Sequence, residues 1–195
     1  VPSNSPRPTP QEKPPPPMDL AISLSAAVLM SAGFTADVGP GVQVSAGLRR
    51  DWFSLDLEVR GMFQSRIYMR EPYDPTKPSS ERPADIAQVT ALLVPCVHFA
   101  TYFAGCGVAQ AGTLIAQTPV DTGLLPSFGF GPRFAFEFPF AERFGVFAFG
   151  EALFTPGTFY GIKDPFPDGR PSPNVIWRQS VVSGFFGTGL SVKFE

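Results

Sequence analysis

The segment SFGFGPRFAFEFPF, residues 127–140, carries phenylalanine at nearly every second position. Glycine, alanine, Arg133 and Glu137 lie between the rings. Because successive side chains of a β-strand point to opposite faces, this spacing predicts a strand with one aromatic face and one face of small and charged residues. Which face meets water decides the fold. The phenylalanines are Phe128, Phe130, Phe134, Phe136, Phe138 and Phe140.

The composition offers little material for a soluble surface. Charged residues make up 16% of the 195 residues, whereas a well-solvated surface carries roughly 25–35%. The formal net charge of −2 and the absence of any run of Lys or Arg argue against a nucleic-acid partner. The length suits one domain with a tail.

The first 17 residues, VPSNSPRPTPQEKPPPP, contain eight prolines and no apolar periodicity. Such a segment favours polyproline II and cannot pack a core. We therefore expect a disordered, proline-rich linker over residues 1–17 and a folded domain over residues 18–195.

The rest of the chain divides into eight segments with the period of a strand. The most regular one, around residue 57, alternates apolar residues with serine and charged residues. The predicted strands span residues 18–30, 41–49, 52–64, 86–98, 102–116, 127–140, 144–154 and 176–194.

The connections between these segments alternate between long and short. In an up-and-down meander, successive connections lie at opposite ends of the sheet, so one end would carry tight turns and the other large loops. Small outer-membrane barrels sort their loops in this way, whereas a Greek-key sandwich has no reason to do so. The long connections are residues 31–40, 65–85, 117–125 and 155–175, and the short ones are 50–51, 99–101 and 141–143.

The two faces of the strands indicate an apolar exterior. Opposite the phenylalanines lie small residues and isolated charges, which make a poor solvent face but suit the narrow lumen of an eight-stranded barrel. Aromatic residues also gather near the strand ends, as in the girdles of membrane barrels. They are Trp52, Phe53, Phe99, Tyr102, Phe138, Phe140, Phe144 and Phe194 beside the tight turns, and Phe34, Phe63, Tyr68, Phe128, Phe154, Tyr160 and Trp177 toward the loops.

Two other folds compete with this interpretation. Residues 86–120 contain no Asp, Glu, Lys or Arg and would suit a spanning helix, but Pro95 and three glycines disfavour a helix there. A soluble lipocalin-like ligand carrier also has eight up-and-down strands, yet it would need the charged exterior that this chain lacks.

The chain resembles small OmpA/OmpX-type outer-membrane β-barrels in its eight alternating segments, its sorted loops and its ending GLSVKFE. In that family the last strand closes with alternating apolar residues and a terminal aromatic that the barrel-assembly machinery reads, a pattern matched by Leu190, Val192 and Phe194. Glu195, after the phenylalanine, departs from it. The resemblance implies an eight-stranded up-and-down antiparallel transmembrane barrel in a bacterial outer membrane.

Cys96 and Cys106 flank the short turn near Thr101 almost symmetrically. In a hairpin they become cross-strand neighbours, close enough for a bond. Because the periplasm is oxidising, we expect a structural disulfide that holds the fourth and fifth strands together where Pro95 removes a ladder donor.

Charged residues on the lumen side fall into two levels when positions are counted from the tight turns. Each level sums to zero, as a plugged, non-conducting barrel would require, because buried charges must be paired. The lower level holds Arg49, Asp56, Glu137 and Lys193, and the upper level holds Glu58, Arg60, Arg133 and Glu151.

Catalytic and cofactor signals are weak. A lipase or acyltransferase needs a histidine, a serine and a carboxylate together, and the only histidine, His98, has no acidic neighbour in the sequence and no GxSxG element to serve. GCGVAQAG, residues 105–112, matches no phosphate-binding spacing. The sequence shows no metal motif, and no cofactor is expected.

The sequence therefore predicts a non-catalytic membrane anchor or scaffold. Both ends of residues 18–195 would lie on the periplasmic side, and residues 1–17 would tether the barrel to a periplasmic partner or domain. The loops at residues 65–85 and 155–175 are candidate contact surfaces for lipopolysaccharide or another protein. A lipid-modifying enzyme is the main alternative.

Overall fold

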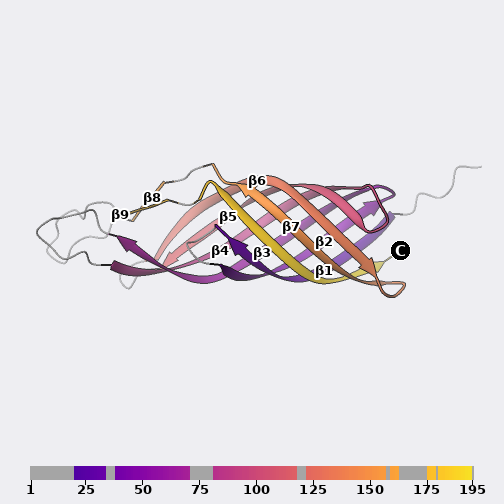
Figure 1. The fold of residues 1–195 in the computed structure, drawn as a ribbon, viewed down its shortest axis with the longest axis horizontal. Coiled ribbons are helices and arrows are strands. Elements are labelled where there is room, and N and C mark those ends of the chain that lie inside the picture. Colours follow the sequence, from indigo (N-terminus) through magenta and orange to yellow (C-terminus); the bar gives the residue numbers. More distant parts are fainter. Residues whose placement is uncertain are drawn as a thin grey trace, which may run out of the picture.

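Eight antiparallel strands form a closed barrel in the computed structural model (Figure 1). Each strand pairs with its neighbours along the chain, and the first strand pairs with the last to close the sheet. The up-and-down architecture predicted from the alternation is thus confirmed. The structure describes residues 20–33, 38–70, 81–117, 122–156, 159–162, 175–178 and 180–194.

The barrel strands are 11 to 18 residues long, and short connections join them at one end of the barrel.

Within the described ranges, no helix is long and apolar enough to cross a membrane. The barrel strands are β1 (Leu20–Ala32), β2 (Gly39–Arg50), β3 (Phe53–Arg70), β4 (Glu81–His98), β5 (Phe103–Gln117), β6 (Thr122–Pro139), β7 (Phe144–Phe154) and β10 (Val182–Phe194), and β8 (Phe159–Ile162) pairs with β9 (Val175–Arg178) in a separate two-stranded sheet.

Three strand ends extend by five residues or more into the expected loops. β3 and β4 extend into the expected loop at residues 65–85 and pair as far as Arg70 with Glu81, after a bulge between Met62 and Ser65. Residues 64–70 contain no glycine or proline to end a strand, whereas three prolines follow in residues 71–80. β6 likewise begins at Thr122, inside the expected loop at residues 117–125.

The predicted last strand, residues 176–194, is divided in the structure. Its first part belongs to β9, which pairs with β8 within the expected loop at residues 155–175, and β10 begins only at Val182. The linker at residues 1–17, Glu195 and the loop segments 71–80 and 163–174 lie outside the described residues.

The helical alternative for residues 86–120 is wrong. β4 and β5 form a hairpin over this region, with Leu92 opposite Gln110 and His98 opposite Ala104. The Pro95 side chain is exposed, and the register of Leu93 with Ala109 continues beyond it at Cys96 with Cys106.

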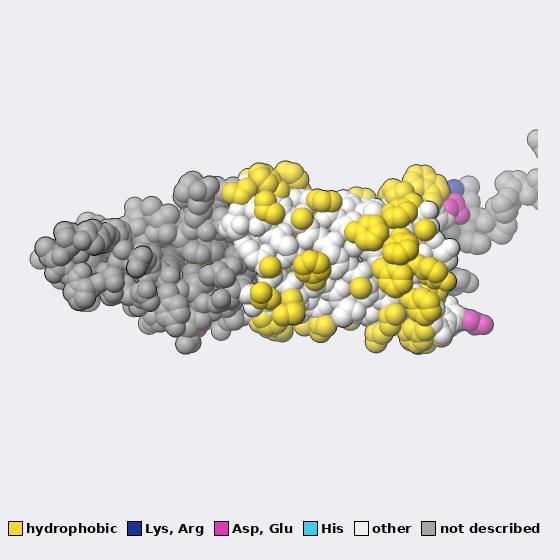
Figure 2. Space-filling view, in the orientation of Figure 1, with side chains coloured by type: hydrophobic (Ala, Val, Ile, Leu, Met, Phe, Trp, Pro, Cys, Tyr) yellow, Lys and Arg dark blue, Asp and Glu magenta, His cyan; other side chains and the backbone are white. Residues whose placement is uncertain are grey.

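The outer face of the barrel is apolar. Phe128 is 59% exposed and Phe186 is 67% exposed, so the rings lie outside and not in a dry centre as a soluble carrier would require. In Figure 2 hydrophobic side chains gather in two bands, and the zone between them shows no charged side chain on this face. Among the described side chains, the exposed aromatic residues are Trp52, Phe53, Phe99, Tyr102, Phe103, Phe134, Phe136, Phe138, Phe140, Phe144 and Phe194 toward the tight-turn end, and Phe63, Phe128, Phe130, Phe154 and Phe186 toward the loops.

Some expected girdle residues are not described. Phe34 and the side chains of Tyr68, Tyr160 and Trp177 fall outside the part of the chain whose side chains the structure places. Among the described side chains, the exposed aromatic residues on the loop side are all phenylalanines.

The lumen is filled in two different ways. Its loop-side half holds a buried apolar cluster that the sequence analysis did not predict, since small residues and charges were expected throughout. Its other half holds the charged residues and a cavity. The apolar cluster includes Leu29, Met62, Ile86, Leu114, Leu153 and Phe185.

Candidate functional site

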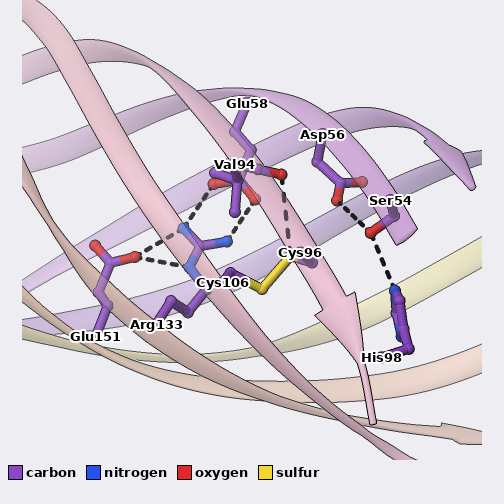
Figure 3. The surroundings of a disulfide bond; sticks show 9 residues. All are labelled: Ser54, Asp56, Glu58, Val94, Cys96, His98, Cys106, Arg133 and Glu151. Atoms are coloured by element: carbon purple, nitrogen blue, oxygen red, sulfur yellow. Dashed lines mark hydrogen bonds and ion pairs between the residues drawn. A yellow bond between two sulfur atoms is a disulfide. The ribbon is translucent and has the colours of Figure 1, made fainter. Parts of the chain in front are cut away.

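The upper level of lumen charges is a closed set of ion pairs. Arg133, from β6, donates from Nη1 and Nη2 to Glu58 on β3 at 2.6 and 2.7 Å, and from Nε to Glu151 on β7 at 2.8 Å. Figure 3 shows the Arg133 guanidinium between these two carboxylates. Arg60 pairs with the second oxygen of Glu151 and also donates to Gln43 at 3.1 and 3.3 Å. Every charge here is buried and paired.

Aromatic rings complete the surroundings of both guanidinium groups. The Arg60 Cζ atom lies 4.6 Å from the ring centre of Phe185, and that of Arg133 lies 4.4 Å from the ring centre of Phe149. A planar guanidinium can stack on a ring while its edge donates hydrogen bonds. Sequence reasoning missed Gln43 and both rings, because their contacts cross the lumen and have no local signal.

The lower level of charges is paired unevenly. Glu137 accepts from Lys193 Nζ at 2.9 Å, from Arg49 Nη1 at 3.4 Å and from the Ser191 hydroxyl at 3.3 Å. Asp56 accepts a hydrogen bond from Ser54 at 3.4 Å. Among the described residues, no cation lies at ion-pair distance from Asp56.

A cavity of about 120 Å³ occupies the tight-turn half of the lumen. It reaches from the rim, at Thr101 and Tyr102, to the Glu58–Arg133 pair. Its polar wall carries the hydroxyls of Ser23, Ser25, Ser45, Ser54 and Ser191, and its apolar wall carries the rings of Phe147 and Phe149.

Cys96 and Cys106 form a disulfide that lines this cavity. They are directly opposed in the β4–β5 ladder, with Cα atoms 4.1 Å apart. Both side chains point inward, next to Arg133 (Figure 3). The predicted bond between the fourth and fifth strands is therefore present.

His98 lies near the rim of the same cavity. Its Nε2 atom is 3.1 Å from the Ser54 hydroxyl, which also contacts Asp56, so the order of the three groups is histidine, serine, carboxylate (Figure 3). A nucleophilic triad places the carboxylate on the imidazole, and this arrangement does not. Among the described residues, no group of three His, Cys, Asp or Glu residues could hold a metal ion.

Two other sequence features have clear positions. Residues 105–112 form the middle of β5 and open no helix, so they cannot act as a phosphate-binding loop. Leu190, Val192 and Phe194 alternate along β10, and Leu190 and Phe194 are exposed on the outer face.

The closed barrel with its apolar exterior is the fold of small eight-stranded outer-membrane proteins. Solved structures share it. Neisserial surface protein A matches with a TM-score of 0.50 and 14% identity, over 90% of this chain and 97% of that chain. The attachment invasion locus protein Ail of Yersinia pestis, solved with the heparin analogue sucrose octasulfate, matches with a TM-score of 0.50 and 10% identity, over 90% of this chain and 97% of that chain.

These identities are low, so the likeness concerns the fold alone. No protein-family model matches the sequence, and no curated protein matches it either. Function therefore has to be argued from the residues of this chain.

Proposed function

We propose that the protein is an integral outer-membrane barrel that serves as a non-catalytic anchor or scaffold. The observation that carries this proposal is the apolar outer face, where rings such as Phe128 and Phe186 are more than half exposed. In water this surface would drive aggregation, whereas in a bilayer it meets acyl chains and the closed sheet leaves no strand edge unpaired.

The lumen supports a scaffold better than a pore or an enzyme. The ion pairs of Arg60 and Arg133 and the apolar cluster around Phe185 fill successive levels of the interior. Among the described residues, the Ser54–His98 contact is the one feature that favours acyl transfer. Asp56, however, contacts the serine, whereas a catalytic triad requires the carboxylate on the histidine.

The sorting of the connections supports an orientation with the tight turns in the periplasm. The first and last barrel strands both reach the tight-turn end, because Leu20 pairs with Arg50 and Val192 pairs with Phe144. Outer-membrane barrels have short periplasmic turns and longer external loops. Residues 1–17 would then extend into the periplasm by roughly 50 Å as polyproline II, as a tether to a periplasmic partner or domain. The loops expected at residues 65–85 and 155–175 would then face outward, as contact surfaces for lipopolysaccharide or another protein.

Membrane integration can be tested in one experiment with two readouts. The chain is expected in the outer-membrane fraction, and the folded form is expected to migrate faster than the boiled form in detergent gels, since a closed barrel resists unfolding. A chain that stays in the aqueous fraction without detergent would refute the proposal.

The orientation and the tether need a separate test. An epitope inserted at residues 141–143 should bind antibody only after the outer membrane is permeabilised. Deletion of residues 1–17 should leave insertion unchanged and abolish co-purification of the periplasmic partner. Surface labelling of intact cells at residues 141–143 would contradict the orientation.

A further inference from the structure

We propose that the cavity at the tight-turn end of the lumen binds a small zwitterion, a molecule with an ammonium group and a carboxylate group a few bonds apart. Small α-amino acids are the chemical class that fits. The proposal goes beyond the anchoring function, because it assigns a ligand to the inside of the barrel.

The first argument is the separation of charge in the lower level. Lys193 and Arg49 both pair with Glu137, at 2.9 and 3.4 Å, so this group of three carries an excess of one positive charge. Asp56, on β3, has no cation at ion-pair distance among the described residues and carries an excess of one negative charge. The level is neutral as a whole, but it presents opposite charges to one cavity.

The Asp56 carboxylate lies against β2 at a position where that strand has a glycine, Gly47. A Cβ atom on Gly47 of β2 would lie 1.9 Å from Asp56 Oδ1 and 2.7 Å from the Ser23 hydroxyl. The absence of a side chain at Gly47 therefore lets the carboxylate lie against β2. A half-buried carboxylate without a cation is costly unless water or a ligand solvates it, and an ammonium group would supply the missing partner.

The positive group can hold the other end of the ligand. An ammonium has three donors and a guanidinium has five, so Lys193 and Arg49 retain donors beyond the bonds they give to Glu137. Their side chains are each 29% exposed, so these donors face the cavity and its opening. A carboxylate placed there gains charge-assisted hydrogen bonds.

Size and shape restrict the ligand further. The cavity measures about 120 Å³, and an apolar cavity of about 150 Å³ accommodates benzene, so the ligand has about six non-hydrogen atoms. The Ser25 and Ser45 hydroxyls, 2.6 Å apart, can each form a hydrogen bond with the ligand. Phe147 and Phe149, with ring centres 6.3 Å apart, leave an apolar wall for a small side chain.

The test is a titration of the isotope-labelled full-length barrel with glycine in a nonionic detergent, followed by NMR. We expect saturable shifts of the backbone amides of Gly47, Ser54 and Lys193. Acetate and methylamine, which each carry one of the two charges, should bind at least about tenfold more weakly. No saturable shift with glycine would overturn the proposal, as would methylamine binding as tightly as glycine.

Two variants assign the ends of the ligand. Asp56→Asn and Lys193→Gln should each weaken glycine binding by about tenfold or more, and unaltered binding to a folded Asp56→Asn barrel would also overturn the proposal. The matched control is Asp51→Asn, in the turn after β2, which should bind as the parent does. Asp51 has a φ of 51°, a conformation that asparagine tolerates. Gel mobility verifies folding, and Lys193→Gln remains decisive if Asp56→Asn fails to fold.

Discussion

At the scale of single residues, Arg133 is the most consequential charge in the lumen. It is the only partner of Glu58 among the described ion pairs and one of two partners of Glu151. Arg133→Ala would leave Glu58 buried without a cation, and breaking a buried pair in this way costs about 3–5 kcal/mol. We expect that loss in the free energy of unfolding, measured by urea titration in detergent.

The matched control for this prediction is Arg143→Ala. Arg143 lies in the exposed turn before β7, where a substitution typically changes stability by less than about 0.5 kcal/mol. Equal stability of the Arg133→Ala and Arg143→Ala barrels would show that the lumen charges are not the paired set that the geometry indicates.

Gly47 offers a second test at this scale. Gly47→Ala would place its methyl group 1.9 Å from Asp56 Oδ1, so the carboxylate must move, at a cost of about 1–3 kcal/mol. Removing the clash by adding Asp56→Ala should restore part of that stability. Gly61→Ala is the control, because its nearest neighbour is 3.9 Å away. A strictly additive double variant would contradict the proposed contact.

At the scale of elements, the β4–β5 hairpin depends on its cross-link. Pro95 supplies no ladder donor next to Cys96, and the disulfide joins the two strands at the following pair. Intact-mass spectrometry should show the purified chain gaining two hydrogen atoms on reduction. Reduction should lower the free energy of unfolding by about 2–4 kcal/mol without opening the barrel. Two free thiols in exported protein would contradict this prediction.

The end of β10 makes a different prediction about assembly. Phe194 and Phe186 lie on the same strand and the same outer face, at 45% and 67% exposure. If the assembly machinery reads the terminal aromatic, Phe194→Ala should slow accumulation of the folded form several-fold in pulse-chase experiments, while Phe186→Ala should not. Equal rates would remove Leu190, Val192 and Phe194 as a signal.

Strands could be predicted from the sequence because their faces differ in chemistry. The alternation of residue types predicted all eight barrel strands. The ends of the strands were predicted from turn residues, and residues 64–70 contain none, so the end of β3 was missed. The apolar cluster escaped prediction because Leu29, Ile86 and Leu114 stand in segments whose two faces are both apolar. In such segments a period of two does not distinguish the lumen face from the outer face.

The candidate site could be predicted only to the level of a list of charges. Counting from the tight turns assigned each charge to a level, but the partners of Arg133 are 75 and 18 residues away in the chain. Closure of the barrel, and not any local pattern, brings Glu58 and Glu151 to one guanidinium. Among the described residues Asp56 has no cation at ion-pair distance, and this too depends on closure of the barrel and left no trace in the sequence.

At the scale of the whole molecule, the filled lumen predicts a barrel that does not conduct. An ion would have to cross both the paired level of Glu58, Arg60, Arg133 and Glu151, all nearly inaccessible to water, and the apolar cluster beyond it. Desolvating an ion there costs several kcal/mol. Planar-bilayer recordings of the folded protein should therefore show no steady current.

A variant can separate the two barriers. Phe185→Ala removes a ring from the apolar cluster and from its stack on Arg60, yet it leaves every ion pair in place. We expect it to remain closed, because the paired charges span the lumen between β3, β6 and β7. Phe185→Ala combined with Glu151→Gln weakens both levels and should produce brief openings. Steady current through the unmodified barrel would show that the lumen is a pore and that its charges line a path and do not block one.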